Sequence, residues 1–136
     1  IVYNANYLRF FEIGRNEFLR ELGFPYAELN EKYDLHFPLA ESHVKYRKPA
    51  WYDDMLEIRC MVLELKNASV TIGYEILNRD TQELLVTGWT KHALVDGRMK
   101  PVALRKKVPE LERAMKRFVE EGGTVHPGDS HKNGGQ

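Results

Sequence analysis

The spacing of apolar residues changes once along the chain, from a helical period to a strand-like period. Tyr7, Phe11, Phe18 and Leu22 recur at intervals of four or seven residues, and polar residues fill the opposite side. This spacing predicts an amphipathic helix over residues 8–22.

Glycine and proline mark the ends of the helical part. Gly14 lies on the apolar stripe, where it costs about 1 kcal/mol of helix propensity relative to alanine. We therefore expect another backbone to pack closely against it. Gly23 follows the last periodic residue and is expected to cap the helix, and Pro25 to Tyr33 is predicted to form a short second helix.

From residue 40 onward, apolar and polar residues alternate, which is the period of a half-buried strand. The connections between these segments are too short for crossover helices, and Asp96-Gly97 is a hairpin-type turn. We therefore predict four strands in an antiparallel meander, over residues 40–46, 56–62, 70–76 and 84–95.

The C-terminal part is predicted to contain one more helix and a tail. The helix spans Arg105 to Glu121, and Gly122 to Gln136 reads as a mobile tail because it is almost free of apolar residues. Residues 1–121 then form one α+β domain, in which the sheet wraps around the long helix. Exposed sheet edges in such a fold favour a homodimer.

Composition narrows the class of function. The 20 basic and 20 acidic residues balance, which argues against a dedicated nucleic-acid binder. No apolar run approaches 18 residues, so we expect no membrane insertion. The single cysteine, Cys60, alternates with inward residues and fits a reducing, cytoplasmic compartment. The histidines form no spaced set with carboxylates or Cys60, so no metal site is expected.

Three sequence motifs resemble those of a known enzyme family. In chain order they are Ile1-Val2-Tyr3-Asn4-Ala5-Asn6-Tyr7 with Phe10-Phe11-Glu12-Ile13-Gly14-Arg15, then Val44-Lys45-Tyr46-Arg47-Lys48-Pro49-Ala50 with Asp53-Asp54-Met55-Leu56-Glu57-Ile58, and Thr90-Lys91-His92-Ala93-Leu94-Val95-Asp96 with Met99-Lys100-Pro101. Together they resemble the hotdog-fold 4-hydroxybenzoyl-CoA thioesterase family and its YbgC-like acyl-CoA thioesterases, over residues 1–118.

The resemblance implies hydrolysis of an acyl-CoA thioester by a dimer or a tetramer of dimers, without metal or redox cofactor. The amides of the turn Tyr3 to Tyr7, at the start of the central helix, would polarise the thioester carbonyl. The family's carboxylate, acting as nucleophile or general base, is an Asp that would lie four positions before Ile1, outside this sequence, together with the strand that precedes it. The chain is therefore expected to be N-terminally incomplete and, on its own, a poor hydrolase.

Three residues are candidates for catalysis. Tyr3 and Asn4 lie in the helix-start turn, and relatives often carry His at the position of Asn4. Asn can hydrogen-bond a carbonyl or a water but cannot shuttle a proton near neutral pH. Glu12 is a helix-borne carboxylate that could reach the thioester, although an exposed ion pair with Arg15, three residues on, explains it more simply.

Five residues are candidates for substrate binding: Asn6, Tyr7, His92, Arg98 and Lys100. Asn6 is also the expected N-cap of the helix, and core packing explains Tyr7 more simply than substrate contact does. His92 could contact pantetheine or act as a satisfied interface histidine. The basic cluster around Arg98 and Lys100 suits the phosphates of CoA, or is a solvated face.

Other classes of function stay open at this point. A non-catalytic hotdog module that binds acyl-CoA or a protein partner is compatible with Asn4. A hotdog dehydratase is less favoured, because no histidine lies between Ile1 and Leu35. The sequence does not distinguish CoA from acyl carrier protein as the donor, nor does it define the acyl group.

Overall fold

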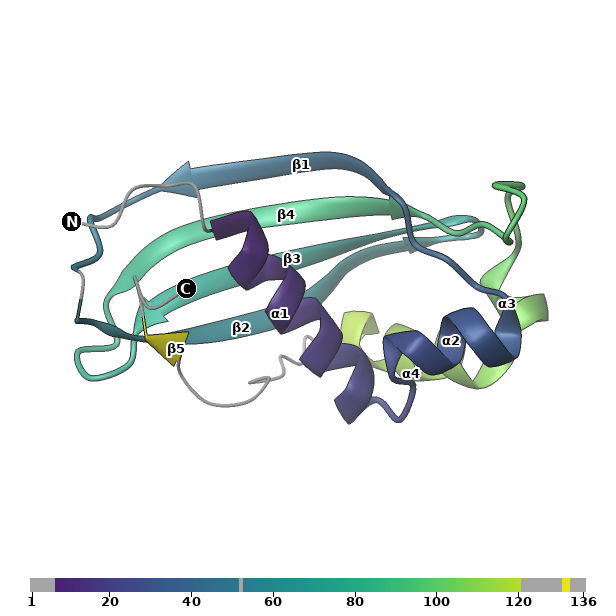
Figure 1. Cartoon of the computed structure of the whole chain (residues 1–136), viewed down its shortest axis with the longest axis horizontal. Coiled ribbons are helices and arrows are strands. Elements are labelled where there is room, and N and C mark those ends of the chain that lie inside the picture. Colours follow the sequence, from purple (N-terminus) through teal and green to yellow (C-terminus); the bar gives the residue numbers. More distant parts are fainter. Residues whose placement is uncertain (1–6, 52, 121–130, 133–136) are drawn as a thin grey trace.

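The protein was analysed as a computed structural model, which describes residues 7–51, 53–120 and 131–132. A long helix crosses one face of an antiparallel sheet, and three shorter helices lie at one end (Figure 1). In chain order the elements are α1 (Tyr7–Glu21), α2 (Tyr26–Tyr33), β1 (Leu39–Tyr46), β2 (Met55–Lys66), β3 (Ser69–Asn78), β4 (Leu84–Ala93), α3 (Leu104–Lys107), α4 (Pro109–Glu120) and β5 (His131–Lys132). The predicted α+β class is confirmed.

The strand order in the sheet is β1-β4-β3-β2-β5, with antiparallel neighbours throughout. The prediction of a four-strand meander is therefore wrong for β1, which pairs with β4 instead of β2. The physical reason is the length of the connection: β2 and β3 are joined by a two-residue turn, whereas residues 47–54 separate β1 from β2. That segment is long enough to carry the chain from β1, at one edge of the sheet, past β4 and β3 to β2.

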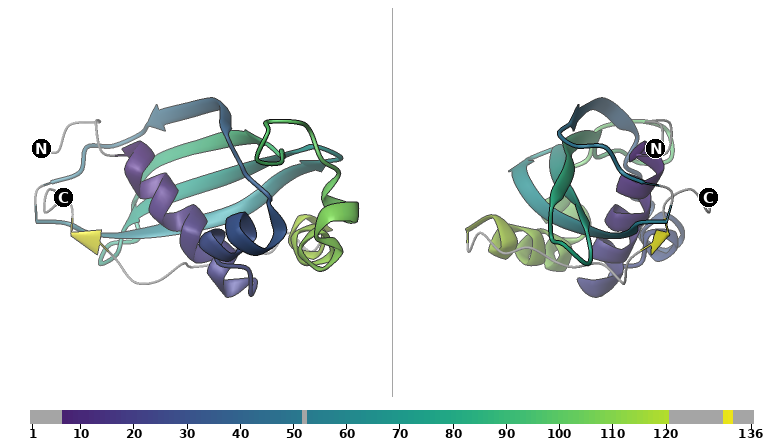
Figure 2. Two further views of the ribbon diagram at one scale, coloured as in Figure 1. Left: turned by 45° about the vertical axis from the view of Figure 1, so that its right-hand side comes forward. Right: turned by 90° about the vertical axis from the view of Figure 1, so that its left-hand side faces the viewer.

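The sheet curves around α1, as the two rotated views show (Figure 2). Gly14 explains how closely the two layers approach. A Cβ atom at this position would lie 2.7 Å from Ile58 Cγ2 and 2.9 Å from Cys60 Sγ, both on β2. Gly14 is closely packed as expected, but the prediction that a backbone approaches it is wrong, because side chains of β2 fill the space.

The start of the α1–α2 connection follows the predicted capping. Gly23 has a φ of +94°, a left-handed conformation that glycine adopts without a steric penalty. Its N–H donates to Arg20 O (3.0 Å), and Phe24 N–H donates to Leu19 O (2.9 Å), which is the Schellman arrangement.

The predicted C-terminal helix is divided in two. Val108 separates α3 from α4 with an extended φ of −141°. Proline disfavours helical geometry in the residue before it, and Pro109 therefore interrupts the helix at Val108 and begins α4. The prediction of one continuous helix from Arg105 to Glu121 is wrong for this reason.

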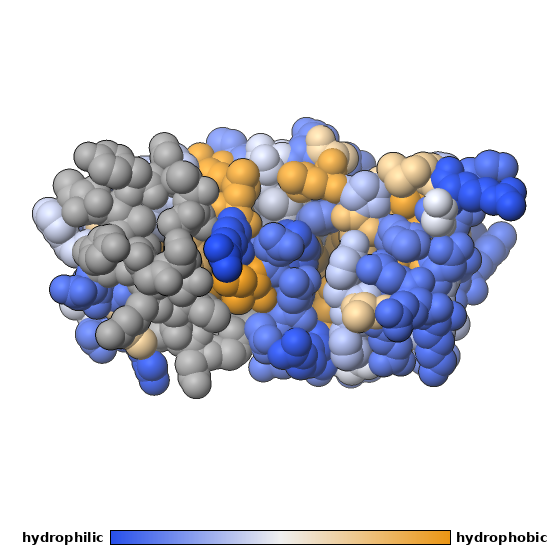
Figure 3. Space-filling model, viewed as in Figure 1, coloured by the Kyte–Doolittle hydropathy of each residue, from blue (hydrophilic) through white to orange (hydrophobic). Residues whose placement is uncertain are grey.

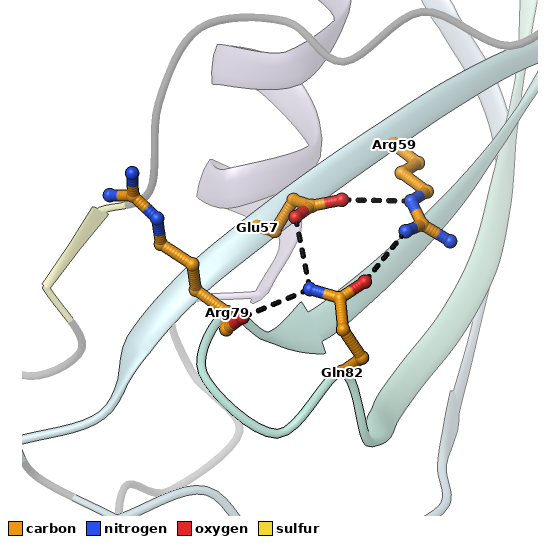
Figure 4. Close-up of polar contacts among 4 residues, drawn as sticks. All are labelled: Glu57, Arg59, Arg79 and Gln82. Carbon is orange, nitrogen blue, oxygen red and sulfur yellow. Dashed lines mark hydrogen bonds and ion pairs between the residues drawn. The ribbon is translucent and has the colours of Figure 1, made fainter.

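A closed set of polar contacts fixes the turn between β3 and β4 (Figure 4). Gln82 has a φ of 62°, and its amide N–H groups donate to Arg79 O (3.0 Å) and Glu57 Oε1 (3.3 Å). Arg59 bridges the other ends, donating to Gln82 Oε1 (2.9 Å) and to Glu57 Oε2 (2.8 Å). The side chain of Gln82 thereby stabilises a backbone conformation that is unfavourable for a non-glycine residue.

The predicted tail is described only at His131–Lys132, which pair as β5 with Met55 and Leu56. The rest of the tail lies outside the described residues, so its mobility stays a prediction, as does the domain boundary at residue 121. Among the helices of the described part, none is long and apolar enough to cross a membrane.

Candidate functional site

The start of α1 is held against the sheet by aromatic packing. Tyr7 is 3% exposed, and its ring centroid lies 6.1 Å from that of Phe10 and 5.6 Å from that of Tyr46 on β1. Tyr7 is thus core packing at the helix start. Tyr3, Asn4 and Asn6, the other candidates from the helix-start turn, lie outside the described residues.

Further along α1, a chain of polar side chains runs through the interior. Arg15 Nη1 donates to Tyr74 Oη (3.0 Å), and Tyr74 Oη lies 2.6 Å from Thr90 Oγ1. Thr90 Oγ1 lies 2.8 Å from His92 Nε2, and His92 Nδ1 lies 3.0 Å from the carbonyl oxygen of Phe37. The chain connects α1, two strands of the sheet and the segment before β1. It also supplies hydrogen-bond partners for the buried polar atoms of Tyr74, Thr90 and His92, which are all at most 2% exposed.

The two ends of this chain determine the direction of every hydrogen bond in it. The Phe37 carbonyl can only accept, so His92 carries its proton on Nδ1 and its Nε2 accepts from the Thr90 hydroxyl. Arg15 can only donate, so the Tyr74 hydroxyl accepts from Arg15 and donates to Thr90. In the neutral ring, both nitrogens of His92 are therefore used.

Burial supports the neutral form of His92. Desolvation, followed by the positive charge of Arg15, lowers the pKa of His92 from 6.5 to about 4. Burial likewise raises the pKa of the Tyr74 hydroxyl, and it raises that of the Cys60 thiol to about 12. Cys60 is accordingly an inert buried thiol, as its position on the strand predicted.

A pocket of about 120 Å³ opens beside this chain, between α1 and the sheet. Its exposed and half-exposed lining residues are mostly polar and come from two helices: Glu12, Arg15 and Asn16 from α1, and Tyr26 from α2. Its buried lining residues are His92 and six apolar residues, namely Phe18, Leu19, Phe37, Val70, Ile72 and Met115. In the space-filling view, apolar surface is visible in the hollow between the polar side chains that cover α1 and α2 (Figure 3).

The pocket brings together two of the candidate residues that are far apart in sequence. Glu12 and His92 both line it. The Glu12–Arg15 ion pair expected from their spacing is not formed, because Arg15 turns inward to Tyr74. Arg15, Tyr74 and Thr90 were not recognised from the sequence as a group. The only signal in the sequence was that Tyr74 and Thr90, which carry polar atoms, occupy inward positions of strands whose other inward residues are mostly apolar.

Arg98 and Lys100 lie elsewhere, in the exposed loop after β4. Asp96 Oδ1 accepts from the N–H groups of Arg98 (2.8 Å) and Lys100 (3.0 Å), which holds the loop in shape. These two bonds also lower the pKa of the Asp96 carboxyl. The loop and the start of α1 are at opposite ends of the sheet (Figure 1). Within one chain, therefore, the structure does not bring Arg98 and Lys100 to the helix start. The described residues contain no group of three His, Cys, Asp or Glu side chains that could hold a metal ion.

Comparison with known proteins identifies the family. The sequence profile of the thioesterase-like superfamily matches residues 1–120. The chain belongs to this superfamily. The YbgC acyl-CoA thioesterase of Haemophilus influenzae is 38% identical over 109 residues, which cover 79% of each chain. The YbgC acyl-CoA thioester hydrolase of Escherichia coli is 33% identical over 109 residues, or 79% of this chain and 80% of the relative.

Solved structures of the superfamily have the same fold. The DHNA-CoA thioesterase of Staphylococcus aureus superposes with a TM-score of 0.79 at 28% identity, covering 90% of this chain and 84% of that one. A gentisyl-coenzyme A thioesterase superposes with a TM-score of 0.70 at 26% identity, covering 80% of this chain and 86% of that one. The expected hotdog architecture, with the sheet wrapped around a central helix, is thus confirmed.

Proposed function

We propose that this protein hydrolyses an acyl-CoA thioester to the free acid and CoA. The observation that carries the proposal is the superfamily match over residues 1–120, together with the YbgC relatives that are named acyl-CoA thioesterases. The buried apolar pocket with a polar rim beside α1 supports it, because the substrate likewise joins an apolar acyl group to a polar pantetheine arm.

In the proposed reaction, the start of α1 polarises the thioester carbonyl. The first amides of a helix have no intrahelical acceptor, and the helix dipole adds partial positive charge there. Both effects stabilise the oxyanion that develops when water attacks the carbonyl carbon. We assign Tyr3, Asn4 and Asn6 to the turn that presents these amides.

A carboxylate is needed to activate the attacking water in this scheme. The family resemblance gives this role to an Asp four positions before Ile1. Glu12 is the alternative carboxylate on α1 itself, one and a half turns beyond Tyr7. Water attacks the carbonyl carbon as one of its protons passes to the carboxylate. The tetrahedral intermediate then collapses, the C–S bond breaks, and the carboxyl group returns the proton to the sulfur, so that CoA leaves as the thiol.

We also propose that the site is shared between two copies of the chain. β1 is an edge strand in which seven of eight residues are exposed, and an open edge of this kind pairs readily with a second copy. Antiparallel pairing of β1 with its copy reverses the ends of the sheet. The loop that carries Arg98 and Lys100 in one protomer then approaches the helix start of the other, which accounts for the separation of these residues within one chain.

In this arrangement Arg98 and Lys100 bind the phosphates of CoA. The second candidate carrier of the acyl group is an acyl carrier protein, which presents the same pantetheine thioester and also suits a basic rim. Pairing of dimers into tetramers and a cytoplasmic location stay predictions from the sequence.

The test is a panel of acyl-CoA thioesters incubated with the protein as its gene encodes it, with thiol release as the readout. Non-hydrolysable S-alkyl-CoA thioethers are titrated in parallel by calorimetry. Thiol release that saturates with substrate supports the proposal. Thioether binding without thiol release contradicts it, and identifies the non-catalytic acyl-CoA-binding module instead.

A further inference from the structure

The pocket beside α1 is closed at its buried end by apolar side chains. Phe18, Leu19, Val70, Ile72 and Met115 are each at most 3% exposed, and they come from three different elements, α1, β3 and α4. Of the polar lining residues on α1, Glu12 is exposed, and Arg15 and Asn16 are half-buried. A ligand that enters must therefore place an apolar group at the closed end and its polar part at the rim.

His92 is the one lining residue at the buried end that carries polar side-chain atoms, and it offers none of them to a ligand. Its Nδ1–H donates to Phe37 O, and its Nε2 accepts from Thr90, so the ring itself offers no free partner to a ligand hydroxyl placed beside it. Burying an unpaired hydroxyl is unfavourable. The polar chain from Arg15 to His92 thus makes the buried end of the pocket apolar in character, although it contains a histidine.

The size of the pocket limits what it can hold. A volume of about 120 Å³ is slightly smaller than the roughly 150 Å³ cavity that binds one benzene molecule in another protein. One six-membered ring or the last few carbons of an alkyl chain fill it. A fused two-ring group is too large without movement of the closely packed walls.

We infer that this pocket selects the acyl group, by enclosing a single ring or the end of a short alkyl chain between α1 and strands β3 and β4. The inference rests on the proposed thioester function and defines its substrate class. Glu12 and Asn16 line the rim, and among the described residues neither makes a side-chain hydrogen bond or ion pair, so both are free to face the polar part of the substrate. Binding then rises with chain length until the pocket is full and falls beyond that length.

The test compares two alanine substitutions on the same strand. Ile72 lines the pocket, whereas Ile76, four residues along β3, is equally buried but does not line it. Ile72→Ala enlarges the pocket by about three carbon atoms, and Ile76→Ala creates the same loss of volume elsewhere in the core. Affinities of S-alkyl-CoA thioethers from methyl to dodecyl, and of S-benzyl-CoA and S-(2-naphthylmethyl)-CoA, are measured for both variants and for the wild type.

We expect the wild type to bind S-benzyl-CoA more tightly than the naphthylmethyl analogue and to show a length cut-off in the alkyl series. Ile72→Ala should move that cut-off to chains two to three carbons longer. For a chain that is two methylene groups longer than the wild-type cut-off, the affinity of Ile72→Ala should rise about tenfold. Ile76→Ala should leave the cut-off in place. Equal affinity across the alkyl series, or superimposable profiles for Ile72→Ala and the wild type, would overturn the inference.

The thioethers separate this inference from the proposed function. A length cut-off that Ile72→Ala shifts, without any hydrolysis of the matching thioesters, leaves the pocket assignment standing and removes the enzymatic one. Hydrolysis without length discrimination does the reverse.

Discussion

At the scale of single residues, the internal chain from Arg15 to His92 is the feature with the clearest physical consequences. Each hydrogen bond in it has a fixed direction, because one end can only donate and the other can only accept. From the sequence alone, His92 is an isolated candidate. Its role depends on Tyr74 and Thr90, whose inward orientation follows from strand register and could not be read from residue type alone.

The first prediction concerns pH. The pKa of His92 lies near 4 in the folded protein and near 6.5 when unfolded, so between these values the unfolded state binds the additional proton. Stability is therefore complete above pH 6.5 and decreases by up to about 3 kcal/mol as the pH falls to 4. Urea denaturation across this range should show the loss in the wild type and a smaller one in His92→Gln. His43→Gln, at an exposed site, serves as control, and equal pH dependence in all three proteins would refute the assignment.

The second prediction concerns Tyr74. Tyr74→Phe keeps the ring that stacks on Phe11 at a centroid distance of 4.3 Å, but it removes the hydroxyl that links Arg15 to Thr90. We expect a loss of about 1–3 kcal/mol in the free energy of unfolding, since the buried Thr90 hydroxyl and the half-buried Arg15 side chain each lose a hydrogen bond. Tyr46→Phe, at a half-exposed tyrosine, should change stability by less than about 0.5 kcal/mol. Comparable effects of the two substitutions would show that the chain contributes nothing.

At the scale of elements, the period of apolar residues located the helices and strands along the chain, but it did not indicate which strands pair. The 3.6-residue period located α1 within one residue of its observed ends, and Gly23 identified its cap. The alternating segments identified β1, but its pairing with β4 depends on a crossing connection, residues 47–54, that carries no periodic signal. The break at Val108 was predictable in principle, because Pro109 restricts the residue before it.

The third prediction tests the contact between α1 and β2. Gly14→Ala should raise the intrinsic helix propensity, yet it introduces a methyl group within 3 Å of Ile58 and Cys60. We expect a net destabilisation of about 1–3 kcal/mol, because overpacking outweighs the propensity gain. Arg9→Ala places the same residue at an exposed position of the same helix and should be nearly neutral. A Gly14→Ala variant as stable as the wild type would contradict the proposed tight packing.

At the scale of the whole molecule, the proposed site extends over two chains. The start of α1 and the loop with Arg98 and Lys100 lie at opposite ends of the sheet (Figure 1), and pairing of two β1 edges would bring them together. The sequence indicated both groups as candidates, but it carried no signal for the distance between them. The pocket was also hidden from the sequence, because its walls come from segments far apart along the chain.

The fourth prediction follows from the shared site. Arg98→Ala combined with Lys100→Ala should raise KM for an acyl-CoA about five- to twentyfold and leave kcat nearly unchanged, because the phosphates are bound equally in the ground and transition states. The same acyl group on pantetheine, which lacks these phosphates, should show no change in KM. A rise in KM for both substrates would place the defect in the fold and not in phosphate binding.

The most direct test of the central claim is hydrolysis of hexanoyl-CoA in water enriched in oxygen-18, with thiol release followed over time and the acid analysed by mass spectrometry. The proposed function predicts CoA release above the buffer rate and one labelled oxygen in each hexanoic acid molecule. No release above the buffer rate, or transfer of the acyl group to another acceptor without label, would contradict it.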